Sequence, residues 1–249
     1  MRYRDAFTYV FRGPNWLVNL LVLALANVVP LIGPIFAFGY SATVTESLRG
    51  GTREDRYPTI DVDRLGDYLL RGLRMFLVSA LASLAIVPVY FLIVFGIIAS
   101  SALGSVAGSQ GSDAAGAIGS AVGCLVMMGG IAVLLALMLS IAVLALPMHL
   151  RAALNPDIKS IFSVAYVRDF LRRVPRESVL FFLVLIVSSV PLVIAGLLLL
   201  VVGAFVVVAY LHLVQAHLLA QLADLYESRG GESIAGAASE MPTPPPLPG

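Results

Sequence analysis

The sequence has few charged residues, and this scarcity excludes an ordinary soluble protein. Only 12% of its 249 residues are Asp, Glu, Lys or Arg, whereas a soluble domain typically has about 25%. Hydrophobic residues make up 59% of the chain, and the mean hydropathy is +0.94. This composition predicts an integral membrane protein.

Reactive groups and their motifs are scarce as well. The chain has a single cysteine, Cys124, so it forms no internal disulfide. It contains no phosphate-binding glycine loop, no His-Glu-x-x-His pair, no Cys-x-x-Cys pair and no nucleophile elbow. We therefore expect no catalytic residues, no bound metal and no cofactor, and we expect that the protein is not an enzyme.

What the sequence does contain is long apolar segments. They cover residues 16–47, 75–99, 121–148 and 179–223, and each matches or exceeds the roughly 20 residues that cross a hydrocarbon core about 30 Å thick. As single helices, the first would be about 48 Å long and the last about 68 Å. Both are too long for one crossing, so each is expected to fold back.

Helix breakers near the middle of these two segments predict where they fold back. The first segment contains Pro30, Gly33 and Pro34, and the last contains Pro191, with a turn expected between Pro191 and Gly203. The expected fold is all-α: a polytopic helical membrane protein with about six membrane-embedded helices, in which two broken hairpins flank two long spans. The first hairpin has two alternatives, because it either crosses fully or enters the membrane and returns.

Basic residues test this arrangement independently. The loop at 100–120 and both proposed turns contain none of the 16 Lys and Arg residues. If both long segments are hairpins, all 16 fall on one side, which the positive-inside rule assigns to the cytoplasm. We therefore predict a multi-pass protein of the inner (cytoplasmic) membrane with both termini in the cytoplasm.

The two hairpins also resemble each other in sequence. An offset of 161 residues superposes Pro14 on Pro175 and Pro30 on Pro191, and it aligns VVPLI (28–32) with SVPLV (189–193). Such a doubling is typical of folds built from repeated membrane units, including many transporters. Both copies begin on the same side, so the repeat would be parallel.

A basic, aromatic-rich stretch precedes each hairpin. In the second stretch, Ile158, Ile161, Phe162, Ala165 and Phe170 fall near one helical face. This pattern predicts basic amphipathic helices in the membrane interface, with arginines toward anionic head groups. The basic residues expected to face lipid are Arg12, Lys159, Arg168, Arg172 and Arg173. Because they flank membrane spans, membrane lipids and not nucleic acid are the expected partners.

The order of several soft motifs resembles a known family. DAFTYVFRGPNW (5–16), a broken apolar hairpin ending in Gly39-Tyr40, SLRGG (47–51) and YPTIDVDRLGDYLLRGLR (57–74) follow one another, and GAFVVVAYLHLVQAHLLAQLADLY (203–226) closes the chain. This order resembles the bacterial and archaeal membrane family catalogued as domain of unknown function 4013. The resemblance covers nearly all of residues 1–228 and implies a multi-pass membrane protein without an assigned activity.

The last apolar segment carries a polar cluster. Its members are His212, Gln215, His217, Gln221 and Asp224. His217, Gln221 and Asp224 share one helical face, and polar groups at membrane depth often mark an ion or substrate site. Interhelical hydrogen bonding near the cytoplasmic end is the favoured interpretation. The five-residue separation of His212 and His217 argues against a metal site.

Other polar groups also have a structural interpretation. Asn19 and Asn27 are expected to pair across the first hairpin with Thr43, Thr45 and Glu46, and a conduction path is the less favoured alternative. Glu46 and Arg49 are also expected to form a weak surface pair. Asp61, Asp63 and Asp67 lie among arginines and lack the spacing of a calcium loop. The glycine-rich run at 104–123 predicts a flexible outer loop up to Gly116 and then close helix packing.

The C-terminal residues have a different composition. Residues 1–228 are expected to form a single membrane domain. Residues 229–249, which end in MPTPPPLPG, are expected to form a disordered Pro-rich cytoplasmic tail that can dock on a protein partner.

For the function, we predict a non-catalytic membrane scaffold or a partner- and lipid-interacting protein. The alternatives are a small-solute or ion transporter that uses the polar residues of the last span, and a lipid-modifying enzyme. The oligomeric state does not follow from the sequence.

Overall fold

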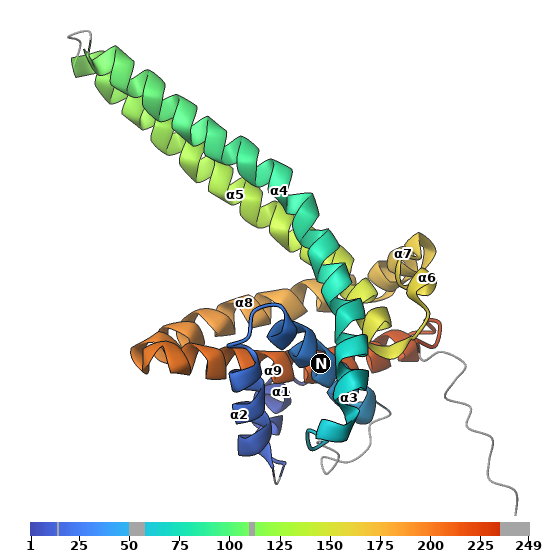
Figure 1. Cartoon of the computed structure of the whole chain (residues 1–249). Helices are drawn as coiled ribbons and strands as arrows, with labels where there is room; N and C mark the ends of the chain where they lie inside the picture. Colours follow the sequence, from blue (N-terminus) through green and yellow to red (C-terminus); the bar gives the residue numbers. More distant parts are fainter. Residues whose placement is uncertain (14, 50–57, 110–112, 235–249) are drawn as a thin grey trace, which may run out of the picture. The chain divides into compact units, whose positions relative to one another are not determined.

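The protein is all-α, as predicted. The computed structural model describes residues 1–13, 15–49, 58–109 and 113–234, and within these ranges all regular structure is helical. In this described part of the chain, nine α-helices and one 3-10 helix follow one another (Figure 1). Their bounds are α1 Tyr3–Tyr9, α2 Trp16–Ala26, α3 Ile32–Leu48, η1 Val62–Arg64, α4 Leu65–Ser109, α5 Asp113–Leu154, α6 Ile158–Ile161, α7 Val164–Arg173, α8 Pro175–Leu198 and α9 Leu200–Ser228.

The chain divides into two compact units, which we describe separately. Unit 1 contains Met1–Val78 and Leu144–Gly249, and unit 2 contains Ser79–Val143. The long helices α4 and α5 each contribute one end to unit 1 and the remainder to unit 2. All 16 Lys and Arg residues belong to unit 1, because residues 79–143 include none.

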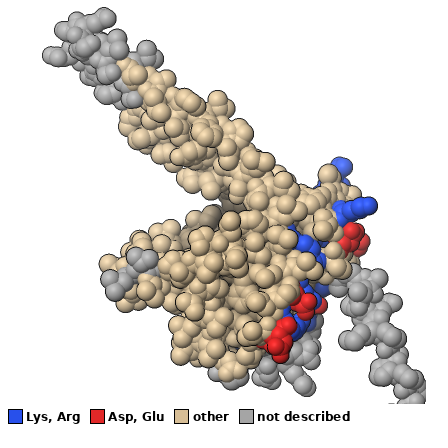
Figure 2. Space-filling view, viewed as in Figure 1, with Lys and Arg blue, Asp and Glu red and all other residues tan. Residues whose placement is uncertain are grey.

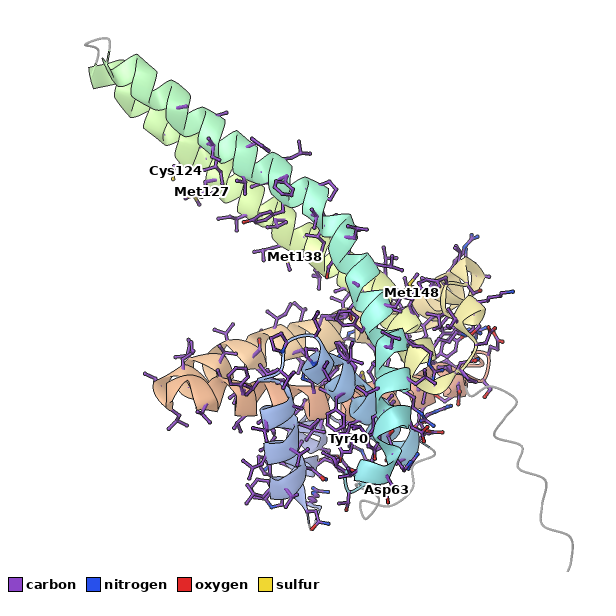
Figure 3. All side chains as sticks on the ribbon, viewed as in Figure 1. Tyr40, Asp63, Cys124, Met127, Met138 and Met148 are labelled. Atoms are coloured by element: carbon purple, nitrogen blue, oxygen red, sulfur yellow. The ribbon has the colours of Figure 1, made fainter. Side chains whose placement is uncertain are left out.

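Unit 2 is a hairpin of two helices that lie side by side (Figure 1). Its side chains are almost entirely apolar, and Cys124 and Met127 lie on α5 (Figure 3). The helices continue much further than the sequence suggested, because α4 extends to Ser109 and α5 begins at Asp113. The loop predicted at residues 100–120 is therefore helical at 100–109 and 113–120, and residues 110–112 lie outside the described residues. Alanine favours helix, and packing against a second helix stabilises a helix beyond its intrinsic propensity.

The centre of unit 1 is the second half of α9. This part of the helix is buried on nearly all sides, and α1, α2, α3 and α8 pack around it. Its fully or almost fully buried residues are Ala209, Leu213, Val214, Ala216, Leu218, Leu219, Ala220, Leu222, Ala223 and Tyr226. Because its buried residues occur on nearly all sides, this segment serves as the axis of unit 1.

The first hairpin reverses where the sequence predicted. Helix α2 ends at Ala26, α3 begins at Ile32, and Pro30 lies in the turn between them. Gly33 and Pro34 lie in the first turn of α3, where proline is tolerated because that N–H has no helical partner. A side chain at Gly33 would meet the backbone oxygen of Ala26, so the glycine lets the two helices approach closely.

The second hairpin reverses later than Pro191. That proline lies inside α8, which continues to Leu198, and the chain turns at Leu199. Pro191 is therefore not a hairpin breaker, although the turn does fall between Pro191 and Gly203. Gly196 and Gly203 face each other across the turn, since a side chain on either would meet the other's backbone oxygen.

Among the described residues, four helical segments are long and apolar enough to cross a membrane. They are Val62–Ala99, Gly123–Leu154, Pro175–Leu198 and Val202–Ser228, and α2 is a shorter apolar helix. The first hairpin supplies none of the four. The predicted total of six embedded helices therefore needs a separate argument for α2 and α3.

The first residues after α9 fold back onto unit 1. Gly230 has a positive φ of 80°, and its N–H donates to the carbonyl of Glu227 (2.9 Å), which ends the helix. Gly231 lies against the ring of Tyr226, and Ile234 is fully buried. We call residues 229–234 the C-terminal clasp. The Pro-rich stretch predicted to dock on a partner begins beyond it and lies outside the described residues.

Candidate functional site

The polar face of α9 binds helix α1. The side-chain amide of Gln221 pairs with the backbone of Arg2, accepting from its N–H at 2.6 Å and donating to its carbonyl at 3.2 Å. The same amide nitrogen lies 2.9 Å from Nδ1 of His217, and the His217 ring packs against Tyr9. Because an amide nitrogen donates, Nδ1 of His217 is the acceptor and the ring carries its proton on Nε2.

The five predicted cluster residues do not converge on one point. His212 faces α3 instead, with its ring 5.4 Å from that of Phe38 and its Nδ1–H bonded to the carbonyl of Val208 (2.8 Å). Gln215 and Asp224 are half-buried elsewhere on α9. His217 and Gln221 are thus the two members that the structure brings together, and their nearest partners belong to α1.

Asn19 holds a loop rather than the partner helix of its hairpin. It is fully buried, its Nδ2 donates to the carbonyl of Pro58 (3.2 Å), and its Oδ1 accepts from the N–H of Ile60 (3.1 Å). The hydroxyl of Tyr40, labelled in Figure 3, donates to the same Pro58 carbonyl at 2.5 Å. The loop before α4 is therefore fastened to both arms of the first hairpin.

The other polar groups predicted to pair across that hairpin find partners elsewhere. Asn27 and Thr43 bond to carbonyls of their own helices, and Thr45 donates to Ser41 and to Ala216 of α9. Those predictions were wrong because a helix carbonyl four residues back is always within reach of a short polar side chain.

The charged residues at the end of α3 pair with other helices. Glu46 forms an ion pair with Arg71 of α4, and Arg49 forms one with Glu227 of α9. The predicted Glu46–Arg49 pair is therefore replaced by two longer-range pairs. Asp61 caps η1 and Asp67 pairs with Arg64, so these two carboxylates of the first charged loop serve local structure.

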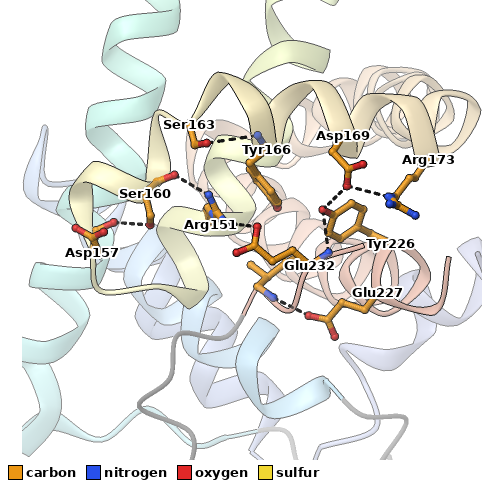
Figure 4. A network of polar contacts seen from close by, with 11 residues as sticks. Arg151, Asp157, Ser160, Ser163, Tyr166, Asp169, Arg173, Tyr226, Glu227 and Glu232 are labelled. Atoms are coloured by element: carbon orange, nitrogen blue, oxygen red, sulfur yellow. Dashed lines mark hydrogen bonds and ion pairs between the residues drawn. The ribbon is translucent and has the colours of Figure 1, made fainter. Parts of the chain in front are cut away.

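A polar network joins α5, α7, α9 and the C-terminal clasp (Figure 4). Arg151 is buried at the end of α5, with its guanidinium 4.0 Å from the centre of the Tyr166 ring. Its Nη1 donates to the carbonyl of Ser160 (3.0 Å), and its Nη2 donates to Glu232 of the clasp (3.0 Å). A buried arginine is stable only when its charge is paired and hydrogen-bonded, and the clasp supplies that carboxylate.

Asp169 connects α7 to α9 in the same network. Its Oδ2 accepts from Nε of Arg173 and from the hydroxyl of Tyr226, both at 2.8 Å. These two hydrogen bonds, that of Arg173 above all, hold the pKa of the Asp169 carboxyl below its ordinary value. Burial raises the pKa of Tyr166, whose ring supports Arg151. Tyr226 in turn accepts from the N–H of Glu232 (3.2 Å), which completes the link to the clasp.

The outer surface of α6 and α7 combines basic and apolar side chains. Lys159, Arg168 and Arg172 are exposed, and Lys and Arg side chains project from this part of the surface in Figure 2. The exposed apolar side chains beside them are those of Ile158, Phe162 and Val164.

Several residues of the predicted amphipathic face lie elsewhere. Ile161 and Phe170 are buried within unit 1, and Phe170 packs on Tyr226. Arg173 is half-buried and donates to Asp169 and to the carbonyl of Arg229. Arg12 is exposed, as the prediction requires, on the segment between α1 and α2. The predicted face is divided between two helices: Ile161 of α6 and Phe170 of α7 pack on protein, whereas Ile158, Phe162 and Ala165 are exposed.

Sequence reasoning missed the residues that build this network. Arg151 directly follows a long apolar segment, and Tyr226 and Glu232 flank the end of α9. A basic residue at the end of a span and a carboxylate shortly after the last span were the available signals. Neither signal specifies a partner, since Arg151 and Glu232 are 81 residues apart.

The described polar side chains serve mainly as contacts within unit 1. Within the described ranges, no group of three or more His, Cys, Asp or Glu side chains could hold a metal ion. The polar side chains described above bind backbone segments or one another, and the candidate spans indicate a multi-pass α-helical membrane protein.

Comparison with known proteins identifies the family. The chain belongs to the family described as "Protein of unknown function (DUF4013)", whose sequence profile matches residues 22–208. This confirms the resemblance found in the sequence. The comparisons with curated proteins and with solved structures gave no match. The family carries no assigned activity, so function must be argued from the residues themselves.

Proposed function

We propose that this protein is a non-catalytic scaffold of the bacterial inner membrane that binds anionic lipid head groups through the outer surface of α6 and α7. One observation carries the proposal: exposed Lys159, Arg168 and Arg172 stand beside exposed Ile158, Phe162 and Val164. Apolar side chains enter the boundary between head groups and acyl chains, and neighbouring cations attract anionic lipid.

The use of the remaining polar groups supports a structural role. His217 and Gln221 hold α1, Asn19 holds the loop before α4, and Arg151 holds the clasp. These contacts occupy the side chains that a transport pathway or a catalytic centre would need. They also anchor the start of the Pro-rich tail at the charged end of unit 1, where a protein partner could dock on that tail.

The proposed topology has six membrane-embedded helices, with α2, α3, α8 and α9 in the two hairpins and α4 and α5 as the long spans. All Lys and Arg residues occur in segments that this topology assigns to one side, and the positive-inside rule makes that side cytoplasmic. Both termini are then cytoplasmic, and the connection between α4 and α5 is external.

The lipid surface can be tested by native mass spectrometry of the protein released from its own membrane. Changing Lys159, Arg168 and Arg172 to Gln removes three charges, each worth about 1 kcal/mol near an anionic surface. Retention of anionic lipid should therefore fall by roughly a hundredfold. The matched control changes Arg2, Arg4 and Arg64, which are also exposed, to Gln. Equal lipid loss from both variants would contradict a specific surface on α6 and α7.

A partner on the tail is tested separately. Crosslinking in intact membranes should capture a protein with the full chain and lose it when residues 235–249 are deleted. Since the clasp ends at Ile234, this deletion leaves the contacts of Glu232 and Ile234 in place. A crosslinked partner that persists after the deletion would place the docking site elsewhere.

A further inference from the structure

We infer that the first hairpin, α2–α3, is re-entrant: it enters the hydrocarbon from the charged side of unit 1 and turns back inside it. Its tip, residues 28–32, would then contact the acyl chains of one leaflet and never reach water on the far side. The inference uses the proposed topology to name that side as cytoplasmic, and it is independent of the scaffold role.

The arms of the hairpin are short when measured from Pro58. Asn19 of α2 and Tyr40 of α3 both donate to the Pro58 carbonyl, so the two arms are level at that point. From Asn19 to the end of α2 at Ala26 the helix rises about 11 Å, and from Ile32 to Tyr40 about 12 Å. With the turn added, the hairpin extends about 15 Å, which is half of a hydrocarbon core about 30 Å thick.

The level of Pro58 marks the edge of the hydrocarbon. Its segment leads directly to Asp61, Asp63 and Arg64, all of which are exposed. Thr59 is exposed as well, and its hydroxyl accepts from Asn15 at the base of α2 (3.0 Å). Extended backbone with exposed charges belongs in water or in the head-group region. Only the part of the hairpin beyond Asn19 and Tyr40 is therefore available for insertion.

The tip of the hairpin presents apolar side chains outward. Val28, Val29, Leu31 and Ile32 are all exposed, Leu31 by 67% and Ile32 by 59%. A turn in water is usually built from Gly, Asn, Asp and Ser. Asn27 is the polar side chain of this turn, and its Nδ2 donates to the carbonyl of Leu23 in its own helix (2.8 Å). The turn is thus built for an apolar surrounding.

Apart from that of Leu31, the backbone N–H groups of the described turn donate to carbonyls within the hairpin, as burial in hydrocarbon requires. Pro30 and Pro34 have no N–H to satisfy. In the described turn, Leu31 is the one remaining residue whose N–H lacks a backbone acceptor. The other N–H groups donate as follows: Asn27 to Leu23 (3.0 Å), Val28 to Leu25 (3.1 Å), Val29 to Ala26 (2.9 Å), Ile32 to Pro30 (2.8 Å) and Gly33 to Val29 (3.0 Å).

Leu31 has a strained backbone conformation. Its φ of 65° and ψ of −54°, with the bond from Ile32 N–H to the Pro30 carbonyl, form a γ-turn of the rare, strained kind. Glycine would adopt this conformation without steric cost. A leucine there gives the tip a large exposed apolar group, which is useful in contact with acyl chains.

Cysteine labelling in sealed vesicles tests the inference on the full chain. In a Cys124→Ala background, Leu31→Cys and Val29→Cys probe the tip. Thr59→Cys reports the cytoplasmic side, and Gln110→Cys, between α4 and α5, reports the outer side. A membrane-impermeant maleimide should label the two controls from opposite sides. It should label neither tip cysteine from either side until detergent is added.

Each other outcome overturns a defined statement. Tip labelling from the side that labels Gln110→Cys would mean that the hairpin crosses. Tip labelling from the side that labels Thr59→Cys would mean that the tip lies outside the hydrocarbon. If both controls label from the same side, the proposed topology fails whatever the hairpin does. A fluorophore attached to Val29→Cys measures the depth of the tip. Brominated lipids should quench its fluorescence most strongly when the bromines lie near the ends of the acyl chains. Stronger quenching by bromines near the head group would overturn the inference.

Discussion

The two hairpins of unit 1 share a sequence pattern but differ in construction. In the first, α2 has 11 residues and α3 has 17, and Pro30 lies in the turn that separates them. In the second, α8 has 24 residues, α9 has 29, and the single residue Leu199 separates them. At about 1.5 Å per residue, α8 is about 36 Å long and can cross a bilayer, whereas α2 is about 17 Å long.

The difference shows that the effect of a proline on a helix depends on the residues around it. VVPLI and SVPLV place Pro30 in a turn and Pro191 inside a helix. Pro30 is followed closely by Gly33 and Pro34, so a continuing helix would lose two N–H donors within four residues. Pro191 has no such neighbours, and Ser188 and Ser189 bond to carbonyls of the preceding turn. A lone proline removes a single N–H donor, so α8 continues through Pro191 to Leu198.

The largest expected effect on stability concerns a feature that both hairpins share: a glycine where two helices approach closely. An added Cβ would lie 2.0 Å from the Ala26 oxygen at Gly33 and 2.3 Å from the Gly196 oxygen at Gly203. Because backbone atoms cannot rotate away, Gly33→Ala and Gly203→Ala should each lower stability by about 3 kcal/mol or more. Thermal unfolding in detergent measures this loss.

A glycine in open space provides the control for that experiment. Gly66 has no atom within 4 Å of an added Cβ, and it lies near the start of α4. Gly66→Ala should therefore leave the unfolding temperature unchanged or raise it slightly, because alanine favours helix. A Gly33→Ala protein as stable as Gly66→Ala would show that the arms of the first hairpin can separate.

The second prediction compares the two prolines that the sequence pattern aligns, Pro30 and Pro191. Pro191→Ala should stabilise the protein by about 1 to 3 kcal/mol, because alanine restores an N–H that can donate to the carbonyl of Val187 inside α8. Pro30→Ala should destabilise it by roughly 0.5 to 1 kcal/mol, because proline restricts the unfolded turn. Thermal unfolding of both variants checks the sign. Effects of the same sign would contradict the different roles of the two prolines.

Local properties could be predicted from the sequence, and long-range partners could not. Apolar length and the breakers at Pro30 and Gly33 specify helices and one turn, because those depend on neighbouring residues. The partner of Gln221 is Arg2, 219 residues away, and that of Asn19 is Ile60, 41 residues away. Such pairs depend on how helices pack, and one sequence does not specify that.

The candidate site illustrates the same limit. Helical spacing correctly placed His217 and Gln221 on one face of the last segment, but it did not predict that α1 would cover that face. The amphipathic pattern predicted one apolar face over residues 158–170, but this stretch forms two helices, and Phe170 packs on Tyr226 of α9. A pattern shows which face is buried, and packing decides what buries it.

The third prediction concerns α1, which packs on the second hairpin through α9. Gln221→Leu removes two hydrogen bonds to the Arg2 backbone, so docking of α1 should weaken by about 1 to 2 kcal/mol. Hydrogen exchange in residues 3–9 should become faster. Gln215→Leu, the same change at a half-buried glutamine of α9, is the control. If Gln221→Leu abolished a measured solute flux while α1 stayed docked, the transport hypothesis would gain support instead.

The smallest expected effect is the pH dependence of α7 at the base of the second hairpin. The hydrogen bond from Arg173 lowers the pKa of Asp169 below 3.8 in the folded protein. A lowered folded pKa contributes stability that is present above the unfolded pKa and is lost as the pH falls through the folded pKa. Hydrogen exchange in α7 should therefore accelerate as the pH drops below about 3.8, after correction for intrinsic rates. Asp169→Asn should abolish this acceleration of exchange, and the control Asp63→Asn should retain it. If the acceleration persists in Asp169→Asn, another group causes the acid sensitivity.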